Sequence, residues 1–414
     1  MARDRPVVSR PATPGPRMIV DLHAHYAMHL VPEKPLGVRQ LLGSSADRRR
    51  LRDRARALLI GLAGLFFNYR SPWAGPRVRM KYLREGGVGV ALSVVLSAID
   101  EADISHGTRP RGDYLDAVTD QMALVARHVA ERHCEQATVA RNPRELRDAV
   151  DGGRLGLVHC VEGGFHLGAD PHAVRDAVTR LAGLGVAYIT LAHLIWRGVA
   201  TNAPGLAPYV SDDAYRVLFP QPAEGLSQLG EAAIEAMVEH HVLVDVTHMS
   251  DRAVAETFAL LDSLDPARRV PVIATHSGYR FGTMEYLLDA STVTRIAERD
   301  GVIGLIFAET KLRDGLARRP LPHVRGRARF EQSFDIFARH IDRIHDITGS
   351  HRHTAIGSDL DGFIKPTLPG FDDMRDMAVL ERALHDRYGG DDATAICSDN
   401  ALRVLASHWR GAAG

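Results

Sequence analysis

Eight short runs of mostly apolar residues recur along the chain, and most of them are rich in β-branched side chains. They cover residues 17–22, 88–97, 155–161, 186–191, 242–247, 270–275, 302–307 and 354–358. Such continuous hydrophobicity is typical of strands buried on both faces of a parallel sheet. Segments with helical spacing lie between most of them, among them residues 114–133, 171–184, 226–241, 252–261, 291–299 and 330–347. The pattern predicts an α/β fold, a (β/α)8 TIM barrel, with a doubly wound sheet as the alternative.

Two serines are placed to begin predicted helices. Ser227 precedes the periodic stretch that contains Glu231, and Ser250 precedes the sequence DRAVAETF. A serine hydroxyl accepts a hydrogen bond from a backbone N–H of the first helical turn. We therefore predict that both residues are N-caps.

The chain of 414 residues could hold two or three domains, but a barrel with insertions reaches this length as one domain. We predict a flexible leader over residues 1–16 and one hydrolase barrel over residues 17–414, with insertions near 37–80 and 311–330. The 51 basic and 51 acidic residues balance, which argues against a nucleic-acid-coating protein. No apolar run approaches the roughly twenty residues of a membrane span. Three widely spaced cysteines form neither a disulfide framework nor a zinc ribbon, so we expect a cytoplasmic protein.

The residues that leave these runs carry the chemical information. Six of the eight runs end in a residue able to bind metal or transfer protons, and these residues are His23, His25, Glu162, His193, His248, His276 and Asp359. The carboxyl ends of the strands surround the active site of a TIM barrel. With 21 histidines in the chain, any single one is weak evidence, but this placement is not random.

Five of these residues are candidate metal ligands: His23, His25, Glu162, His248 and His276. Residues two apart on a strand face the same side, so both histidines of the first run can reach one ion. One ion is compatible with the set, but five ligands fit two divalent ions better, with Glu162 between them. Imidazole nitrogen suits Zn²⁺, and also Mn, Fe or Co at sites of mixed nitrogen and oxygen ligands.

Two further strand-end residues are candidates for the catalytic chemistry. Two adjacent ions can share a water and lower its pKa. Asp359 would then orient this water and carry its proton to the leaving group, with Asp361 as the second choice. His193 would donate a hydrogen bond to the substrate oxyanion. Asp21 and Asp245 lie inside the runs, where they are expected to orient neighbouring ligands.

Seven motifs occur in the order and spacing of a known family. They are VDLHAH, VEGGFH, YITLAHL, VLVDVTHMS, PVIATHS, AIGSDLDG and SDNALRVL, and they run from Met18 to Leu405. In these motifs the chain resembles the membrane (renal) dipeptidase family of zinc peptidases, within the amidohydrolase superfamily. The resemblance implies an amidohydrolase-type barrel, two zinc ions and a homodimer. By position it implies as metal ligands His23, Glu162 (bridging), His248 and His276, with His193 polarising the substrate and Asp359 as general acid/base.

The sequence departs from this family at two positions. The family's first motif is His-x-Asp, whereas this chain has His25 at the third position. The family's substrate-carboxylate arginine, about eleven residues after the sixth-strand histidine, corresponds in register to Leu287. We predict that another cation holds the carboxylate, either Arg280 or the basic segment Arg318–Arg329, which includes Arg325 and Arg327. The alternative is that the natural substrate has no free carboxylate at this place. A solvated basic loop is the alternative for that segment.

The sequence thus predicts a binuclear metal-dependent hydrolase, dipeptidase-like, that cleaves a peptide or amide bond of a small molecule. One alternative is a non-peptidase amidohydrolase, such as an N-acyl amino acid deacylase or a lactonase. Another is a catalytically lapsed barrel that acts as a binding protein. The expected partners are the small-molecule substrate and a second copy in a homodimer, without nucleic acid and without a membrane span.

Overall fold

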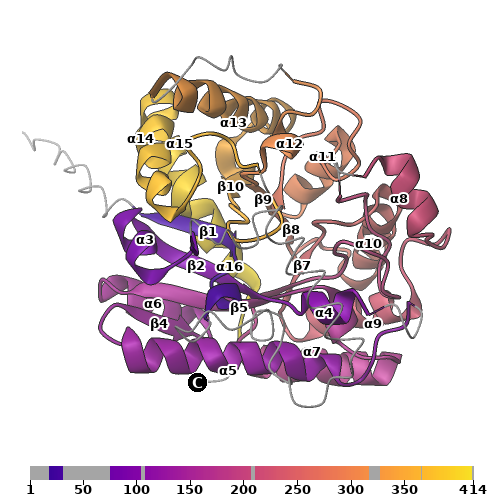
Figure 1. Ribbon diagram of the computed structural model, residues 1–414. Coiled ribbons are helices and arrows are strands. Elements are labelled where there is room, and N and C mark those ends of the chain that lie inside the picture. The colour runs from indigo at the N-terminus through magenta and orange to yellow at the C-terminus, as the bar shows by residue number, and fades with distance from the viewer. Residues whose placement is uncertain are drawn as a thin grey trace, which may run out of the picture.

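A computed structural model of the protein describes residues 18–30, 75–103, 108–206, 210–316, 327–364 and 366–412. Within these ranges, eight parallel strands form a closed barrel at the centre of the molecule (Figure 1). In ring order they are β1 (Ile19–Ala24), β2 (Val88–Val95), β5 (Leu155–Glu162), β6 (Tyr188–Thr190), β7 (Leu243–Asp245), β8 (Val272–Ser277), β9 (Val302–Leu305) and β10 (Thr354–Ile356). The ring closes because β2 pairs with β5 on one side and with β1 on the other. The prediction of a (β/α)8 barrel is confirmed.

Helices surround the strands, with α13 and α14 at the top of the view and α5 and α7 at the bottom (Figure 1). The first half supplies α3 (Met80–Glu85), α4 (Ala98–Glu101), α5 (Tyr114–Arg132), α6 (Pro143–Asp151), α7 (Pro171–Gly183), α8 (Asp212–Leu218) and α9 (Gln228–Glu239). The second half supplies α10 (Asp251–Leu264), α11 (Ala290–Glu298), α12 (Glu309–Leu312), α13 (Arg327–Thr348), α14 (Met377–Tyr388), α15 (Gly390–Thr394) and α16 (Asn400–His408). Single turns complete the set: η1 (Ala27–His29), η3 (Gly164–His166), η4 (His351–His353), η5 (Met374–Asp376) and the π-helical η6 (Ala395–Asp399). Among the described helices, none is long and apolar enough to cross a membrane.

The predicted elements and the observed ones coincide in kind and in order. Each of the eight apolar runs overlaps a barrel strand, and each of the six periodic segments overlaps a helix. Both predicted N-caps are present, since the Ser227 hydroxyl accepts from Leu229 N and the Ser250 hydroxyl accepts from Ala253 N. The leader over 1–16 and most of the two predicted insertions lie outside the described residues.

Among the strands of the described residues, one was not predicted. Strand β4 (Ala137–Ala140) pairs with the first half of β5, from Leu155 to Val158, while β6 pairs with the end of β5 at Val161 and Glu162. The four-residue sequence ATVA follows a 19-residue helix closely and shows no pattern of its own. Its position depends on the edge of β5 that β6 leaves open.

An apolar cluster joins the strands to the C-terminal helix. Val20, Val90 and Val158 of three strands share this cluster with Leu405 of α16 and with the fully buried Trp409. The apolar side chains of α16 therefore pack on the barrel strands. The polar residues singled out by the sequence lie instead at the carboxyl ends of the barrel strands.

Candidate metal centre and active site

The carboxyl ends of six barrel strands deliver seven polar side chains to one cluster, and all seven are buried. His23 and His276 lie within β1 and β8, whereas Glu162 is the last residue of β5. The others follow their strands by one to three residues: His25 after β1, His193 after β6, His248 after β7 and Asp359 after β10. The structure thus brings together every strand-end residue that the sequence singled out.

Irregular pairing occurs at two of these histidines. The register of β1 shifts between Asp21 and Ala24, around His23, and the register of β8 shifts between Ala274 and Ser277, around His276. Such an irregularity re-aims a side chain that strict alternation would place on the other face of a sheet, and it is common beside active sites.

Glu162 lies at the middle of the cluster. Its Oε1 is 3.4–3.5 Å from the Nε2 atoms of three histidines, His23, His248 and His276. Its Oε2 is 3.5 Å from Nε2 of His193 and 3.8 Å from Nε2 of His25. Although burial opposes ionisation, the imidazoles of His193 and His23 hold the pKa of Glu162 well below its usual range. One carboxylate therefore faces all five imidazoles.

The two histidines within strands, here named the strand pair, have their Nδ1 atoms bound. Tyr188 donates its hydroxyl proton to Leu22 O at 3.0 Å, so it accepts from His23 Nδ1 at 2.9 Å. Thr275 donates to Asp245 Oδ2 at 2.7 Å, so its hydroxyl accepts from His276 Nδ1 at 2.9 Å. With the proton on Nδ1, each imidazole directs the lone pair of its Nε2 at the cluster, where His276 Nε2 lies 2.9 Å from Nε2 of His248.

Asp245 and Asp21 bind residues next to the candidate ligands, Thr275 beside His276 and Ser358 beside Asp359. This agrees with the orienting role expected from the sequence. Asp245 also accepts from the hydroxyls of Thr190 and Thr247 at 2.6 Å each. Asp21 accepts from the backbone N–H and the hydroxyl of Ser358, just before Asp359. Both carboxylates therefore fix strand ends rather than enter the cluster themselves.

The two candidate metal ligands His25 and His248, which follow strands and are here named the loop pair, are held differently. The buried Nδ1 atoms of His25 and His248 have no hydrogen-bond partner in the described part of the chain. His248 has a positive φ of 67°, and Asp359, whose Oδ1 is 2.9 Å from His25 Nε2, has a φ of 55°. Non-glycine residues in this conformation are strained, and strain of this kind concentrates at functional sites.

These donor atoms fit divalent metal ions. Three overlapping sets of ligand atoms lie within 4.8 Å of one another: His23–His25–Glu162, His23–His276–Asp359 and Glu162–His193–His248. Tetrahedral zinc with bonds of about 2.0–2.1 Å places its ligand atoms about 3.3 Å apart, close to the 3.4–3.8 Å spacing around Glu162. The buried His23 Nε2 and Glu162 Oε2 lack hydrogen-bond partners among the described residues, so both lone pairs are available. Burial and the neighbouring imidazoles of His23 and His248 also hold the pKa of His276 well below its usual range, in its ligand form.

His193 is positioned by a residue that the sequence analysis missed. Glu101, at the end of α4 after β2, accepts from His193 Nδ1 at 2.6 Å and from the backbone N–H groups of Leu194 and Ile195. Burial alone would lower the pKa of His193, but Glu101 and Glu162 outweigh it and raise the pKa to about 9. His193 Nε2 therefore carries a proton that it can donate into the cluster. A single carboxylate four residues beyond an apolar run gave no sequence signal.

Asp359 and Asp361 occupy different environments. Asp359 faces the cluster, 2.9 Å from His25 Nε2 and 3.8 Å from His23 Nε2. Asp361 accepts backbone N–H groups from Arg77 at 2.9 Å and from Val78 at 2.8 Å. The geometry therefore favours Asp359 for proton transfer and gives Asp361 a structural contact.

Arg280, one of the cations predicted to hold a substrate carboxylate, makes its contacts outside the cluster. Arg280 binds both carboxylate oxygens of Asp251, at 2.8 and 2.6 Å, and the carbonyls of Leu287 and Glu285. The Leu287 side chain is fully buried in the core. Most of Arg318–Arg329, including Arg325, lies outside the described residues, and Arg327 begins α13.

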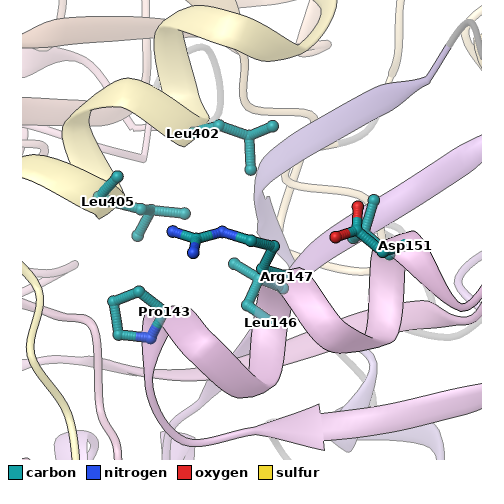
Figure 2. A pocket seen from close by; sticks show the side chains of 8 residues that line it. Pro143, Leu146, Arg147, Asp151, Leu402 and Leu405 are labelled. Atoms are coloured by element: carbon teal, nitrogen blue, oxygen red, sulfur yellow. The ribbon is translucent and has the colours of Figure 1, made fainter. Parts of the chain in front are cut away.

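A separate apolar groove lies between two helices. Figure 2 shows it between α6 and α16, with side chains of Pro143, Leu146, Arg147, Asp151, Leu402 and Leu405 around it. None of the converging histidines lines this groove. The candidate chemistry therefore belongs to the strand-end cluster.

The family described as membrane dipeptidase (peptidase family M19) matches residues 67–410 of the chain. Dipeptidase 3 of Rattus norvegicus is 26% identical over 270 residues, which are 63% of this chain and 47% of that protein. The match thus spans about half the length of that curated relative.

Two solved structures share the fold over almost their whole length. One is the dipeptidase AC, a metallo peptidase of family M19, with a TM-score of 0.66 and 19% identity. The other is a metallo peptidase from Rhodobacter sphaeroides liganded with a phosphinate mimic of the dipeptide L-Ala-D-Ala, with a TM-score of 0.65 and 18% identity. In both cases 95% of this chain is covered, together with 99% of the other chain.

Proposed function

The chain belongs to the membrane dipeptidase family, peptidase family M19, and on this premise we propose that it is a metal-dependent dipeptidase. The observation that carries the proposal is the arrangement around Glu162, whose two carboxylate oxygens lie within 3.8 Å of five imidazole nitrogens. The substrate is a dipeptide or a similarly small amide.

The proposed ligands are His23, His25, Glu162, His248 and His276, and the proposed ions are two Zn²⁺ with Glu162 between them. Ions bound there supply Lewis acidity and a water of lowered pKa. The strand pair supports this role because each Nδ1 is bound by a hydroxyl, which leaves the lone pair of each imidazole on Nε2. His25 in place of the family's aspartate makes the ligand set more positive by one charge, so metal preference is a property to be measured.

The remaining chemistry rests on two side chains. Asp359 Oδ1 takes up the proton of the attacking water and passes it to the nitrogen of the leaving amine. His193 donates its Nε2–H to the carbonyl oxygen as negative charge develops there. Glu101 stabilises this proton through its 2.6 Å contact with Nδ1.

Metal analysis combined with a substrate panel tests the proposal. The purified protein is expected to bind close to two equivalents of zinc and to hydrolyse at least one dipeptide of a panel that includes C-terminal D-residues. A fully loaded content of one equivalent would contradict the binuclear site. Turnover only on N-acyl amino acids or lactones would indicate a non-peptidase amidohydrolase, and metal binding without any turnover would indicate a binding protein.

We also propose that the protein is a cytoplasmic homodimer. The three cysteines, Cys134, Cys160 and Cys397, are all free thiols, which fits a reducing compartment. Light scattering after size-exclusion chromatography tests the dimer, and cell fractionation tests the location.

A further inference from the structure

We propose, on the premise of the dipeptidase function above, that Lys311 binds the carboxylate of the substrate's leaving amino acid. Lys311 lies in α12, the short helix that follows β9. The ends of β2 and β9 are the two strand ends at which the sequence analysis found no candidate. The first of them supplies Glu101 to the site, and the second supplies Lys311.

The ammonium group of Lys311 is buried without a carboxylate beside it. The residue is only 7% exposed, and its Nζ donates one hydrogen bond, to Gly205 O at 2.9 Å. In the described part of the chain, no carboxylate forms an ion pair with Lys311 within 4.0 Å. An ammonium has three N–H donors, and burying a charge without a counter-ion is costly. Burial accordingly lowers the pKa of Lys311 to about 8, against the opposing charges of Asp212 and Asp359.

The contacts of Lys311 place it beside the loop pair. Its Nζ lies 4.4 Å from the centre of the Tyr286 ring, and this ring packs on His248 with centroids 5.1 Å apart. The Tyr286 hydroxyl donates to the His276 carbonyl at 2.8 Å, which fixes the ring against both histidines. Gly205, whose carbonyl binds the ammonium, also borders the His248 ring, since a Cβ there would lie 3.9 Å from Nδ1. One aromatic ring therefore separates the cation from the metal ligands.

The leaving group of a dipeptide fits this arrangement. Its nitrogen and its carboxylate are attached to the same carbon, so a cation for the carboxylate must lie on the side where the nitrogen is protonated. Asp359, the proposed proton donor, is among the charges that act on Lys311. Arg280 is a weaker candidate, because both oxygens of Asp251 already occupy its guanidinium. A lysine and a carboxylate form a charge-assisted hydrogen bond, the stronger kind.

The test compares a dipeptide with its C-terminal amide. We expect wild-type kcat/KM to favour the free acid by about 10- to 100-fold, the usual contribution of a hydrogen bond between charged groups. Lys311→Met should bring the ratio close to one by raising KM for the acid, with the amide unchanged. Lys311→Arg should restore part of the preference. Lys81→Met is the matched control, because the Lys81 side chain is 75% exposed on α3, and it should leave the ratio unchanged.

A second measurement does not depend on turnover. The phosphinate mimic of L-Ala-D-Ala and its C-terminal amide are titrated calorimetrically into metal-loaded and metal-free protein. Lys311→Met should remove the preference for the acid in each form that binds the mimic.

Three results would overturn the proposal. An equal kcat/KM for acid and amide in the wild type would show that no cation holds the carboxylate, while the dipeptidase function would stand. Equal losses on both substrates in Lys311→Met would show that the lysine only ties α12 to Gly205. If Arg280→Ala loses the preference for the free acid while Lys311→Met keeps it, Arg280 holds the carboxylate. If the wild type cleaves no dipeptide, the proposed function fails, and the calorimetric ratio still reports on Lys311.

Discussion

His23 and His276 lie within strands β1 and β8, whereas His25 and His248 follow the ends of β1 and β7. In the strand pair each Nδ1 is held by a hydroxyl that is itself anchored, so the rings are aligned before any ion binds. In the loop pair the buried Nδ1 atoms have no partner among the described residues. The comparison indicates that hydrogen bonds of the fold orient one half of the candidate metal site, while the other half depends on the ions and on strained backbone.

Glu162→Gln is expected to have the largest effect, because Glu162 Oε1 faces both pairs at once. The change removes the negative charge that five imidazoles share, so both ions should be lost together and activity should fall below detection. Metal content by mass spectrometry is the measurement. Glu309→Gln is the control, since Glu309 is also buried and pairs with Arg313 outside the cluster. Retention of one full equivalent in Glu162→Gln would show that the two halves bind metal independently.

Asp359→Asn separates chemistry from metal binding beside the loop pair. Asp359 contacts His25 at 2.9 Å, but its proposed task is proton transfer. The variant should keep its fold and its metal while turnover falls by about 10²- to 10⁴-fold, the usual contribution of general acid–base catalysis. Asp361→Asn is the matched comparison and should lower thermal stability instead, because it accepts the Arg77 and Val78 backbone N–H groups. Full turnover in Asp359→Asn would contradict the assignment.

Tyr188→Phe and Thr275→Val turn the strand pair into an analogue of the loop pair. Each variant removes the hydroxyl that binds a histidine Nδ1, and outer partners of this kind contribute about 10- to 100-fold to metal affinity. Competition with a chelator measures the change. Thr190→Val is the control, since Thr190 donates to the same Asp245 as Thr275 but to no ligand imidazole in the described residues. Unchanged affinity in both variants would remove the difference between the pairs.

His340 extends the comparison to a histidine whose two nitrogens are both bound by backbone. Nδ1 accepts from Tyr279 N and Nε2 donates to Leu312 O, each at 2.9 Å, and burial lowers the pKa to about 4. Below the pKa of about 6.5 in the unfolded chain, His340 binds a proton when the protein is unfolded but not when it is folded. The stability of the fold therefore decreases as the pH decreases.

Because of His340, the free energy of unfolding should decrease by about 1 kcal/mol as the pH falls from 7 to 5.5. His340→Gln should therefore show a flatter dependence of Tm on pH than the wild type, with both proteins free of metal. Parallel slopes would show that His340 is protonated in the folded state.

Much of the site was predictable because strand ends are a local property of the sequence. A short run of β-branched residues specifies a strand buried on both faces, and in a parallel barrel all such runs end on one rim. His23, Glu162 and Asp359 could therefore be grouped before any contact was known. Glu101 could not, because its partner His193 is 92 residues away and a lone carboxylate after a short helix has no periodic signal.

The sequence by itself determined the barrel, the order of its strands and the residue types at its active rim, because hydrophobic patterning and strand direction act over a few residues. Only the tertiary structure decided how those residues are held. The closure of β2 on β5, the irregular register at His23 and the hydroxyls that meet the strand pair join residues far apart in the chain. Lys311 also depends on tertiary structure, because Lys311, Gly205 and Tyr286 lie in three separate segments that follow strands. Which polar atoms are paired after burial depends on packing between distant segments, and no local pattern carries that information.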